Sequence, residues 1–309
     1  MKEKKVMSPF YQDVQAIHIA KIDKEIIQKK YLNLSIDVSR FFENLDSINI
    51  YECPDTKYRF YHPYSIMGDD KFYEELQIKI TNYYPNDKGE FKVALREIEE
   101  ENKILEIGCG DGSFIELARK HFNRINLKGL EFNDKAIEKC RSKKINVEKK
   151  SIEEFSINNF EEFDIVVFFQ VLEHIQEVNN FLIASISVLK KGGKLILAVP
   201  DNSPYYRNFR IHETMNLPPH HIGLWNEVSF KNLEKKFDIR LDSVDYVGNT
   251  GYFSNIYYFM EYKFIQNKIN KFKYILMPFL LPYAIFKVLR MKINGELKPH
   301  CIVCTYTKT

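Results

Sequence analysis

The stretch ILEIGCGDGSFIELA at residues 104–118 constrains the fold of this chain more than any other. The run from Lys103 to Ile107 predicts a buried strand, and the pattern from Ser113 onward predicts an amphipathic helix. Three glycines between them let the backbone bend sharply and approach a ligand closely, because no Cβ stands in the way. The start of the helix adds unpaired N–H groups and a partial positive charge that favour an anionic group. The stretch therefore predicts a site for a nucleotide-like cofactor.

The spacing of the glycines separates one class of cofactor from two others. A dinucleotide fingerprint needs its third glycine at position 113, where Ser113 stands, and a phosphate-binding P-loop needs a Gly-Lys-Ser/Thr ending that is absent here. What remains is Glu-x-Gly-x-Gly-x-Gly, with Glu106 at the end of the strand. This pattern resembles the first motif of class I S-adenosylmethionine (AdoMet) methyltransferases. In that family the loop packs against the methionine part of the cofactor, and the strand-end acid helps to hold the loop and the amino group.

A second acidic residue follows at the sequence spacing that a nucleotide-cofactor site requires. Residues 125–140 predict a second strand that ends at Glu131, then a helix capped by Asn133 or Asp134. A carboxylate at that strand end accepts both ribose hydroxyls, and it lies roughly twenty residues past the glycines. The resemblance also puts residues 151–153 beside the adenine, although many members carry aspartate where a serine stands here. The predicted cofactor-binding residues are Glu106, Gly108, Cys109, Gly110, Asp111, Gly112, Glu131, Phe132, Ser151, Ile152, Glu153 and Gln170.

The segment EEFDIVVFFQVLEHI at 161–175 continues the pattern. Asp164 opens a continuous apolar run that suits a central parallel strand buried on both faces. Gln170 follows at its carboxyl end, where ligands bind in open α/β sheets. The next residues place Glu173 and His174 at the mouth of the site, and VLEHI resembles the fourth motif of the methyltransferases that modify quinones, sugars and small metabolites.

The segment LKKGGKLILAVPDN at 189–202 completes the resemblance, which covers roughly residues 90–245. It implies an α/β fold, a Rossmann-like seven-stranded and mostly parallel sheet with an antiparallel last strand. We expect a small α+β N-terminal cap and a helical insertion before the last strand in addition. The expected domains are residues 1–90, an N-terminal helix and an aromatic-rich cap, and residues 91–309, the AdoMet-dependent methyltransferase domain with its insertion at 252–297.

The cap contains a lysine-rich stretch and a module of short strands. The apolar spacing in residues 1–32 predicts a helix, whereas Ile48–Cys53 and Tyr58–Tyr61 predict strands and a further helix begins near Asp70. Related sugar-modifying enzymes often carry a small zinc unit here, but Thr56 stands where a second cysteine would be needed, so we expect no metal. The cap is either a lid that recognises the substrate or simple packing against the sheet.

The segment at 200–230 is the strongest pointer to substrate chemistry. It leaves the carboxyl end of a strand, and long loops of this kind in compact domains are more often functional than idle. Pro218-Pro219-His220-His221 holds two imidazoles on a stiff backbone, and the single tryptophan, Trp225, follows. This stretch, with FYEELQ and the pair Tyr83-Tyr84, resembles methyltransferases encoded with surface-polysaccharide genes.

Methyl transfer to a hydroxyl needs a base, and histidine suits that role because its pKa lies near neutrality. The candidates are His174, His220 and His221, with Glu173 as an orienting partner. The preferred function is O-methylation of a sugar or nucleotide sugar for a surface glycan. One alternative is methylation of a quinone or lipid-like small molecule, which VLEHI and the apolar insertion also suit. The other is a non-catalytic AdoMet-binding scaffold.

The composition argues against nucleic acid as a partner and against disulfide bonds or a cysteine-bound zinc ion. The net charge of +3 gives no support to nucleic-acid binding, and no Asn/Asp-Pro-Pro-Tyr/Phe motif follows the fourth strand. Five cysteines in 309 residues do not resemble a disulfide framework, and Cys301-x-x-Cys304 has no second pair to complete a zinc site. The N-terminus lacks the apolar core of a signal peptide, so a cytoplasmic location is expected.

The insertion before the last strand is apolar between basic ends. Its apolar core is too short to span a bilayer, and we expect Pro278 and Pro282 to break it. Peripheral membrane contact through residues 272–292 and a homodimer contact both fit this composition.

Overall fold

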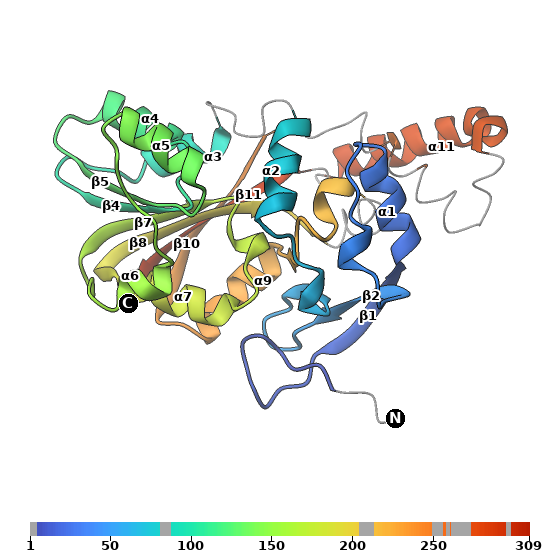
Figure 1. Cartoon of the computed structure of the whole chain (residues 1–309), viewed down its shortest axis with the longest axis horizontal. Helices are drawn as coiled ribbons and strands as arrows, with labels where there is room; N and C mark the ends of the chain where they lie inside the picture. Colours follow the sequence, from blue (N-terminus) through green and yellow to red (C-terminus); the bar gives the residue numbers. More distant parts are fainter. Residues whose placement is uncertain are drawn as a thin grey trace.

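The protein is described by a computed structural model over residues 5–80, 88–203, 213–248, 256–257, 260, 273–294 and 298–309. Within this part, a seven-stranded sheet carries helices on both faces, and a smaller four-stranded sheet lies beside it (Figure 1). The paired residues Tyr83-Tyr84 and the segment 204–212 lie outside the described residues.

The large sheet has the strand order β10-β11-β8-β7-β4-β5-β6. Strand β11 runs antiparallel to both of its neighbours, β8 and β10, and the pairs among β8, β7, β4, β5 and β6 are all parallel. The Rossmann-like sheet with an antiparallel last strand is thus confirmed. Its strands are β4 (Lys103–Ile107), β5 (Asn126–Leu130), β6 (Asn146–Glu148), β7 (Phe163–Phe169), β8 (Leu189–Pro200), β10 (Ile239–Val247) and β11 (Cys301–Lys308).

The core fills both faces of this sheet, because neighbouring residues of a strand point to opposite sides. On one face, helices α3 (Gly89–Leu95), α4 (Ser113–His121) and α5 (Asp134–Ser142) pack against strand residues such as Ile104 and Val167. On the other, α6 (Ile152–Ser156), α7 (Val178–Ser187) and α9 (Glu227–Lys231) pack against residues such as Leu105 and Val166 (Figure 1). Helix α9 begins at a capping box formed by Asn226 and Ser229, and the 3-10 turn η5 (Asn232–Lys235) continues the helix.

The C-terminal cysteines are separated by this alternation. Cys301 belongs to the core cluster on one face of the sheet and Cys304 to the cluster on the other. Their side chains therefore diverge from the same strand, and the C-x-x-C spacing does not bring two ligands together.

The four-stranded sheet has the order β1-β2-β3-β9. With helices α1 (Lys24–Leu32) and α2 (Asp70–Lys79) and the 3-10 turns η1 (Ser39–Phe41) and η2 (Tyr64–Ile66) it forms the cap. Three of its strands come from the N-terminal part and one, β9, from the segment that follows the paired histidines. The strands are β1 (Ile17–Asp23), β2 (Ser47–Glu52), β3 (Arg59–His62) and β9 (Gly223–Leu224).

The prediction of a helix throughout residues 1–32 is wrong in its middle part. Residues 17–23 form strand β1, which pairs with β2 and buries Ile22, and the helix begins only at Lys24. The helix then buries Ile27 and Tyr31 four residues apart. Pairing with the edge of β2 satisfies the backbone hydrogen bonds of residues 17–23. This tertiary contact outweighs the preference for a helix that the spacing of the isoleucines indicates.

In the described part of the insertion, residues 273–293 form helix α11 (Lys273–Ile293), and Pro278 and Pro282 lie inside it. The expectation that these prolines break it is therefore wrong. Each proline removes one N–H donor and crowds the carbonyl one turn before it, and residues four apart lie on the same side of a helix. Both prolines are exposed, so the disturbed hydrogen bonds lie together on one outer side and the helix continues. Among the described helices, none combines the length and the apolarity needed to cross a bilayer.

Candidate active site

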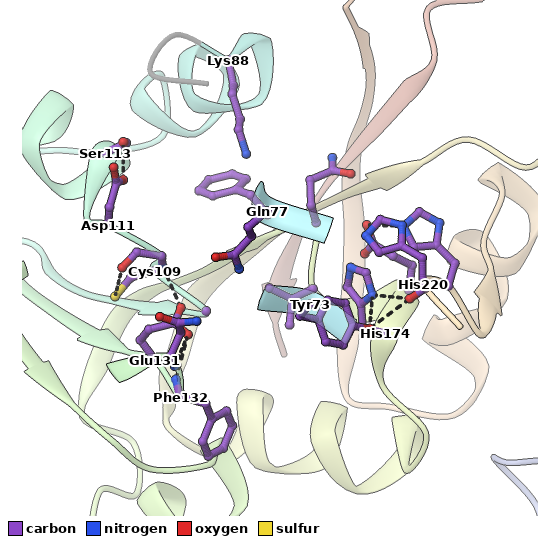
Figure 2. A pocket seen from close by; sticks show the side chains of 18 of the residues that line it. Tyr73, Gln77, Lys88, Cys109, Asp111, Ser113, Glu131, Phe132, His174 and His220 are labelled. Atoms are coloured by element: carbon purple, nitrogen blue, oxygen red, sulfur yellow. Dashed lines mark hydrogen bonds and ion pairs between the residues drawn. The ribbon is translucent and has the colours of Figure 1, made fainter. Parts of the chain in front are cut away.

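A cavity of about 1080 Å³ lies at the carboxyl ends of the parallel strands, under helix α2 of the cap. Figure 2 shows its two ends. The glycine loop with Cys109, Asp111 and Glu131 lies at one end, and the histidines lie at the other. Tyr73 and Gln77 reach in between them from α2 (Figure 2). A single cavity of this size has room for a cofactor and a second small molecule side by side.

The glycine loop adopts the tight turn that the sequence predicts. Gly108, Gly110 and Gly112 all have positive φ, at 69°, 53° and 81°. A Cβ on Gly108 would lie 2.6 Å from Cγ2 of Val171, so this position needs glycine for space as well as for conformation. Gly112 has a different role: it does not line the cavity, and a Cβ there would meet Cδ1 of Ile145 at 2.3 Å.

Glu131 holds the loop in shape by accepting backbone hydrogen bonds with both carboxylate oxygens. Its Oε2 accepts from the N–H of Gly110 at 2.8 Å, and its Oε1 accepts from those of Phe132 and Asn133 at 2.8 and 2.9 Å. Asn133 in turn caps helix α5 by accepting from Ala136 N–H. The acid at the end of the second strand therefore ties the glycine loop to the start of the next helix.

Glu106 lies at the base of the loop, 4% exposed and in contact with the cavity. Its Oε2 has no hydrogen-bond partner within the described chain, and burial raises its pKa well above the usual range. A buried carboxylate with an unused oxygen favours a cationic or N–H-rich ligand group, because such a group restores the interactions lost on leaving water.

Four predicted cofactor contacts lie elsewhere. Gly112 and residues 151–153 are not among the residues that line the cavity. Ser151 caps helix α6 in a capping box with Glu154, and Ile152 is packed in the core with 1% exposure. The adenine contact assigned to 151–153 stays a prediction. The remaining predicted positions, Glu106, Gly108, Cys109, Gly110, Asp111, Glu131, Phe132 and Gln170, all line the cavity.

The structure brings the three candidate histidines into one cluster. His174 ends the 3-10 turn η3 (Leu172–His174), and His220 and His221 follow the turn η4 (Thr214–Asn216). The ring centroids of His174 lie 4.9 Å from those of both His220 and His221, and the latter two stack at 4.2 Å. All three rings line the cavity.

Burial keeps these imidazoles neutral. It lowers the pKa of His174 to about 4 and that of His220 to about 3, and it lowers the pKa of His221 well below its usual value. For each ring the largest cause is the loss of water around the charged form. At neutral pH each ring therefore offers one N–H and one nitrogen lone pair.

Glu173 stands beside the cluster and is 1% exposed. Neither of its carboxylate oxygens has a hydrogen-bond partner among the residues that the structure describes. Oε1 lies 4.0 Å from Nε2 of His221, and burial raises the pKa of Glu173 to about 8. The acid predicted as an orienting partner is therefore near the histidines but makes no hydrogen bond to them.

The sequence interpretation missed several residues of the cavity wall. Tyr73 of α2 lies with its hydroxyl 3.2 Å from Nδ1 of His174, and it donates to the backbone oxygen of His220 at 3.1 Å. Lys88 and Glu90 line the cavity beside the glycine loop. The helical repeat of FYEELQ places Tyr73 and Gln77 on one side of a helix, and this spacing is the signal that could have marked them as a pair.

Comparisons with known proteins identify a methyltransferase domain in this chain. A family model described as "Methyltransferase domain" matches residues 83–244. The ubiquinone biosynthesis O-methyltransferase of Rickettsia conorii is 28% identical over 129 residues, which are 40% of this chain and 43% of that protein. The mitochondrial ubiquinone biosynthesis O-methyltransferase of Homo sapiens is 34% identical over 102 residues, or 31% of this chain and 28% of that protein. The chain thus spans less than half the length of these relatives.

A solved structure of a Pyrococcus horikoshii protein shares the fold. It has a TM-score of 0.50 and 14% sequence identity, and the match covers 78% of this chain and all of that one. At this identity the likeness concerns the arrangement of strands and helices alone.

Proposed function

Since this chain belongs to the family that carries this methyltransferase domain, we propose that it transfers the methyl group of AdoMet to a hydroxyl oxygen of a quinone-like ring. One observation carries the proposal: a single cavity joins the glycine loop to a cluster of buried proton acceptors. AdoMet is the cofactor, and it supplies, when bound, a methyl group activated by a sulfonium for in-line displacement.

The residues at the glycine end suit this cofactor. The unused Oε2 of Glu106 is a partner for its ammonium group, which is the cationic group that such a buried carboxylate needs. Gly108 leaves room for close approach of the backbone, and Glu131 holds the Gly110 amide in place. In our proposal these residues bind and orient the methyl donor, and Phe132 and Gln170 complete the wall.

The residues at the histidine end suit a hydroxyl acceptor. Alignment of two reactants in one site contributes about 7–11 kcal/mol to lowering a barrier, and removal of the hydroxyl proton adds roughly 10²–10⁴-fold in rate. The neutral rings of His174, His220 and His221 present nitrogen acceptors for that proton inside the cavity, beside the buried side chain of Glu173. We propose that the hydroxyl binds there and loses its proton to this cluster.

The relatives, rather than the PPHH segment, support the proposed class of acceptor. Both curated relatives are named for O-methylation in ubiquinone biosynthesis, which favours a hydroxylated, quinone-like ring. The sugar or nucleotide sugar that the sequence analysis preferred has no comparable support. It remains as the competing outcome of the assay below.

Helix α11 supports an apolar substrate in a second way. It exposes Ile275, Phe279, Phe286 and Ile293 at 68, 77, 61 and 83%. Arg290 and Lys292 lie in its last turn, so the same helix can bind anionic lipid headgroups. We propose peripheral contact of α11 with a membrane surface, where quinone-like lipids reside. Flotation with anionic vesicles tests this, and sedimentation as a dimer without vesicle binding would assign the helix to a second copy instead.

The decisive experiment follows the labelled methyl group of AdoMet into products. The protein is incubated with polyprenylated dihydroxybenzenes or with a panel of nucleotide sugars, and the label is partitioned between organic and aqueous phases. We expect label in the organic phase. Label only in the aqueous phase would restore the sugar interpretation, and no transfer despite binding of S-adenosylhomocysteine would support a non-catalytic scaffold.

Separate alanine substitutions of the three histidines test the role of the cluster. We expect each of His174→Ala, His220→Ala and His221→Ala to lower kcat, with losses of roughly 10²–10⁴-fold for a residue that accepts the proton. His121→Ala, on the exposed last turn of α4, is the matched control and should keep full activity. Full activity in all three cluster variants would remove the histidines from the mechanism.

A further inference from the structure

The three clustered histidines share a feature that proton transfer alone does not require. One ring nitrogen from each of His174, His220 and His221 lies within 4.8 Å of the corresponding nitrogens of the other two. The rings come from two parts of the chain, since η3 supplies one and the segment after η4 supplies two. The fold therefore converges three nitrogen donors on one point beside the cavity.

Each ring is held in the same tautomer by an oxygen acceptor on its Nδ1. His174 Nδ1 lies 2.7 Å from the backbone oxygen of His220, and His220 Nδ1 lies 2.8 Å from that of Met215. His221 Nδ1 lies 3.2 Å from Oδ1 of Asn216. A carbonyl oxygen only accepts, so each Nδ1 carries the hydrogen and each Nε2 carries the lone pair.

The orientation of the Asn216 amide is fixed independently. Its Nδ2 donates to Oδ1 of Asn202, which leaves Oδ1 to accept from His221. Oxygen acceptors on the outer nitrogen are the usual support of histidines that bind metal ions, because they fix the ring and raise its basicity.

Glu173 supplies the second, independent observation. Its carboxylate is buried at 1% exposure, and neither oxygen has a partner in the described ranges. Oε1 faces Nε2 of His221 at 4.0 Å, which is too far for a hydrogen bond, so both groups keep unused binding capacity. A buried carboxyl group without a partner is costly, and a cation between it and the imidazole would favour its ionised form.

We propose that His174, His220 and His221 bind a divalent transition-metal cation such as Zn²⁺, with Glu173 as the fourth ligand. Three imidazoles and one carboxylate form a nitrogen-rich set that suits zinc and its neighbours, whereas Mg²⁺ and Ca²⁺ prefer oxygen ligands. Zinc–nitrogen bonds are about 2.0–2.1 Å long, so ring nitrogens up to 4.8 Å apart must move toward one another to bind one ion.

The sequence predicts no metal, because neither Cys301-x-x-Cys304 nor the segment around Thr56 offers paired cysteines for zinc. The proposed ligands are instead histidines, and His174 and His220 are 46 residues apart. The sequence marks them as candidate bases, and only the folded structure brings one nitrogen of each ring together.

The role of the cation in catalysis rests on the function proposed above. An acceptor hydroxyl that enters the cavity can become a fifth ligand, and a bound cation lowers the pKa of a coordinated hydroxyl. With the cation bound, the ring nitrogens are ligands and no longer accept the proton, which leaves to solvent as the O–H bond breaks. The new O–CH₃ bond forms, and the methyl–sulfur bond breaks to leave a neutral thioether. No oxidant or further reactant is needed for this balance.

Cobalt titration tests the site without any assay of activity. The untagged full-length protein is stripped with a chelator, dialysed and titrated with Co²⁺ while the visible absorption of the bound ion is followed. We expect one Co²⁺ per chain, with a spectrum of low-coordinate nitrogen and oxygen ligation that Zn²⁺ displaces. His174→Ala and His221→Ala should abolish this spectrum.

Two further variants make the test specific. Asn216→Ala removes the oxygen that positions His221 without touching the ion, so we expect roughly 10- to 100-fold weaker binding of Co²⁺. His121→Ala changes an exposed residue at the end of helix α4, so this variant should bind Co²⁺ as the unchanged protein does. Binding of S-adenosylhomocysteine and the melting temperature show that each variant is folded.

The outcomes separate the two proposals. Absence of stoichiometric Co²⁺ binding, or binding that survives His174→Ala and His221→Ala in folded protein, overturns the metal site. Specific binding without methyl transfer to any acceptor leaves the site standing and refutes the proposed function. If chelator-treated protein that is shown to hold no metal still transfers methyl groups at the full rate, the proposed function is supported and the catalytic role of the cation is refuted.

Discussion

Glu131→Gln is the substitution that tests the cofactor end of the cavity most directly. The wild-type carboxylate accepts three backbone hydrogen bonds on two oxygens, from the N–H groups of Gly110, Phe132 and Asn133. Glutamine keeps the shape but replaces one oxygen with an NH₂ donor. Either the Gly110 amide or the other two amides must then face a donor and lose their partner.

The expected magnitude follows from this count. A hydrogen bond to a charged acceptor contributes about 1.5–3 kcal/mol, and at least one of the three is lost. If the loop regains its shape only when the ligand binds, that cost appears in the dissociation constant, where about 1.4 kcal/mol is tenfold. We therefore expect S-adenosylhomocysteine to bind roughly 10-fold or more weakly to Glu131→Gln, measured by calorimetric titration.

Glu153→Gln is the matched control, because Glu153 does not line the cavity. It should leave binding of S-adenosylhomocysteine unchanged, with NADH as a ligand that neither protein binds. Equal affinity of Glu131→Gln and the unchanged protein would refute the role of this acid in shaping the loop. A loss in Glu153→Gln as large as that in Glu131→Gln would return the adenine contact to residues 151–153.

Three further predictions concern stability. Trp225 is fully buried and stacks on Phe230, so Trp225→Ala should destabilise the fold by about 3–5 kcal/mol in urea unfolding, and an unmoved midpoint would contradict its place in the core. Gly112→Ala combines a φ of 81° with a Cβ only 2.3 Å from Ile145, so it should lower stability by about 2–4 kcal/mol, whereas a neutral result would refute the reasoning. Bonds to lysines and a tyrosine lower the pKa of Glu227 to about 2, so the stability from this group is present above its unfolded pKa and is lost as pH falls toward 2. Glu227→Gln should therefore weaken the fold at pH 7 and flatten its acid unfolding curve between about pH 5 and 2, and an unchanged curve would contradict the ion pairs.

Much of the large sheet could be read from local patterns. Strand β4, the turn at the three glycines and the start of α4 at Ser113 lie where the sequence predicts them, because apolar runs, glycines and caps are local signals. The cap was harder. The isoleucines of residues 17–23 fit helical spacing, and only the pairing with β2 makes this segment a strand.

The candidate site shows a similar division. His174, His220, His221 and Glu173 were all named from motifs, but their distances and the oxygen on each Nδ1 depend on how two distant segments fold together. Tyr73 was missed because its hydrogen-bond partners, His174 and the backbone oxygen of His220, lie 101 and 147 positions away in the sequence. Sequence patterns identify chemical groups well, and they do not carry contacts of this range.

Strand β9 has a consequence for building chimaeras of this protein. Gly223 and Leu224 pair with Phe60 and Arg59 of β3, and Ile222 accepts a further bond from the amide of Tyr61. The segment 213–224, called the histidine segment because it contains His220 and His221, therefore joins the four-stranded sheet through strand β9, which begins two residues after His221. A cap transplanted from another protein would meet a strand shaped for a different edge, and a catalytic fragment cut at residue 90 would leave β9 unpaired. The cap and the histidine segment therefore have to be transplanted together, and we expect only such grafts to preserve the cavity.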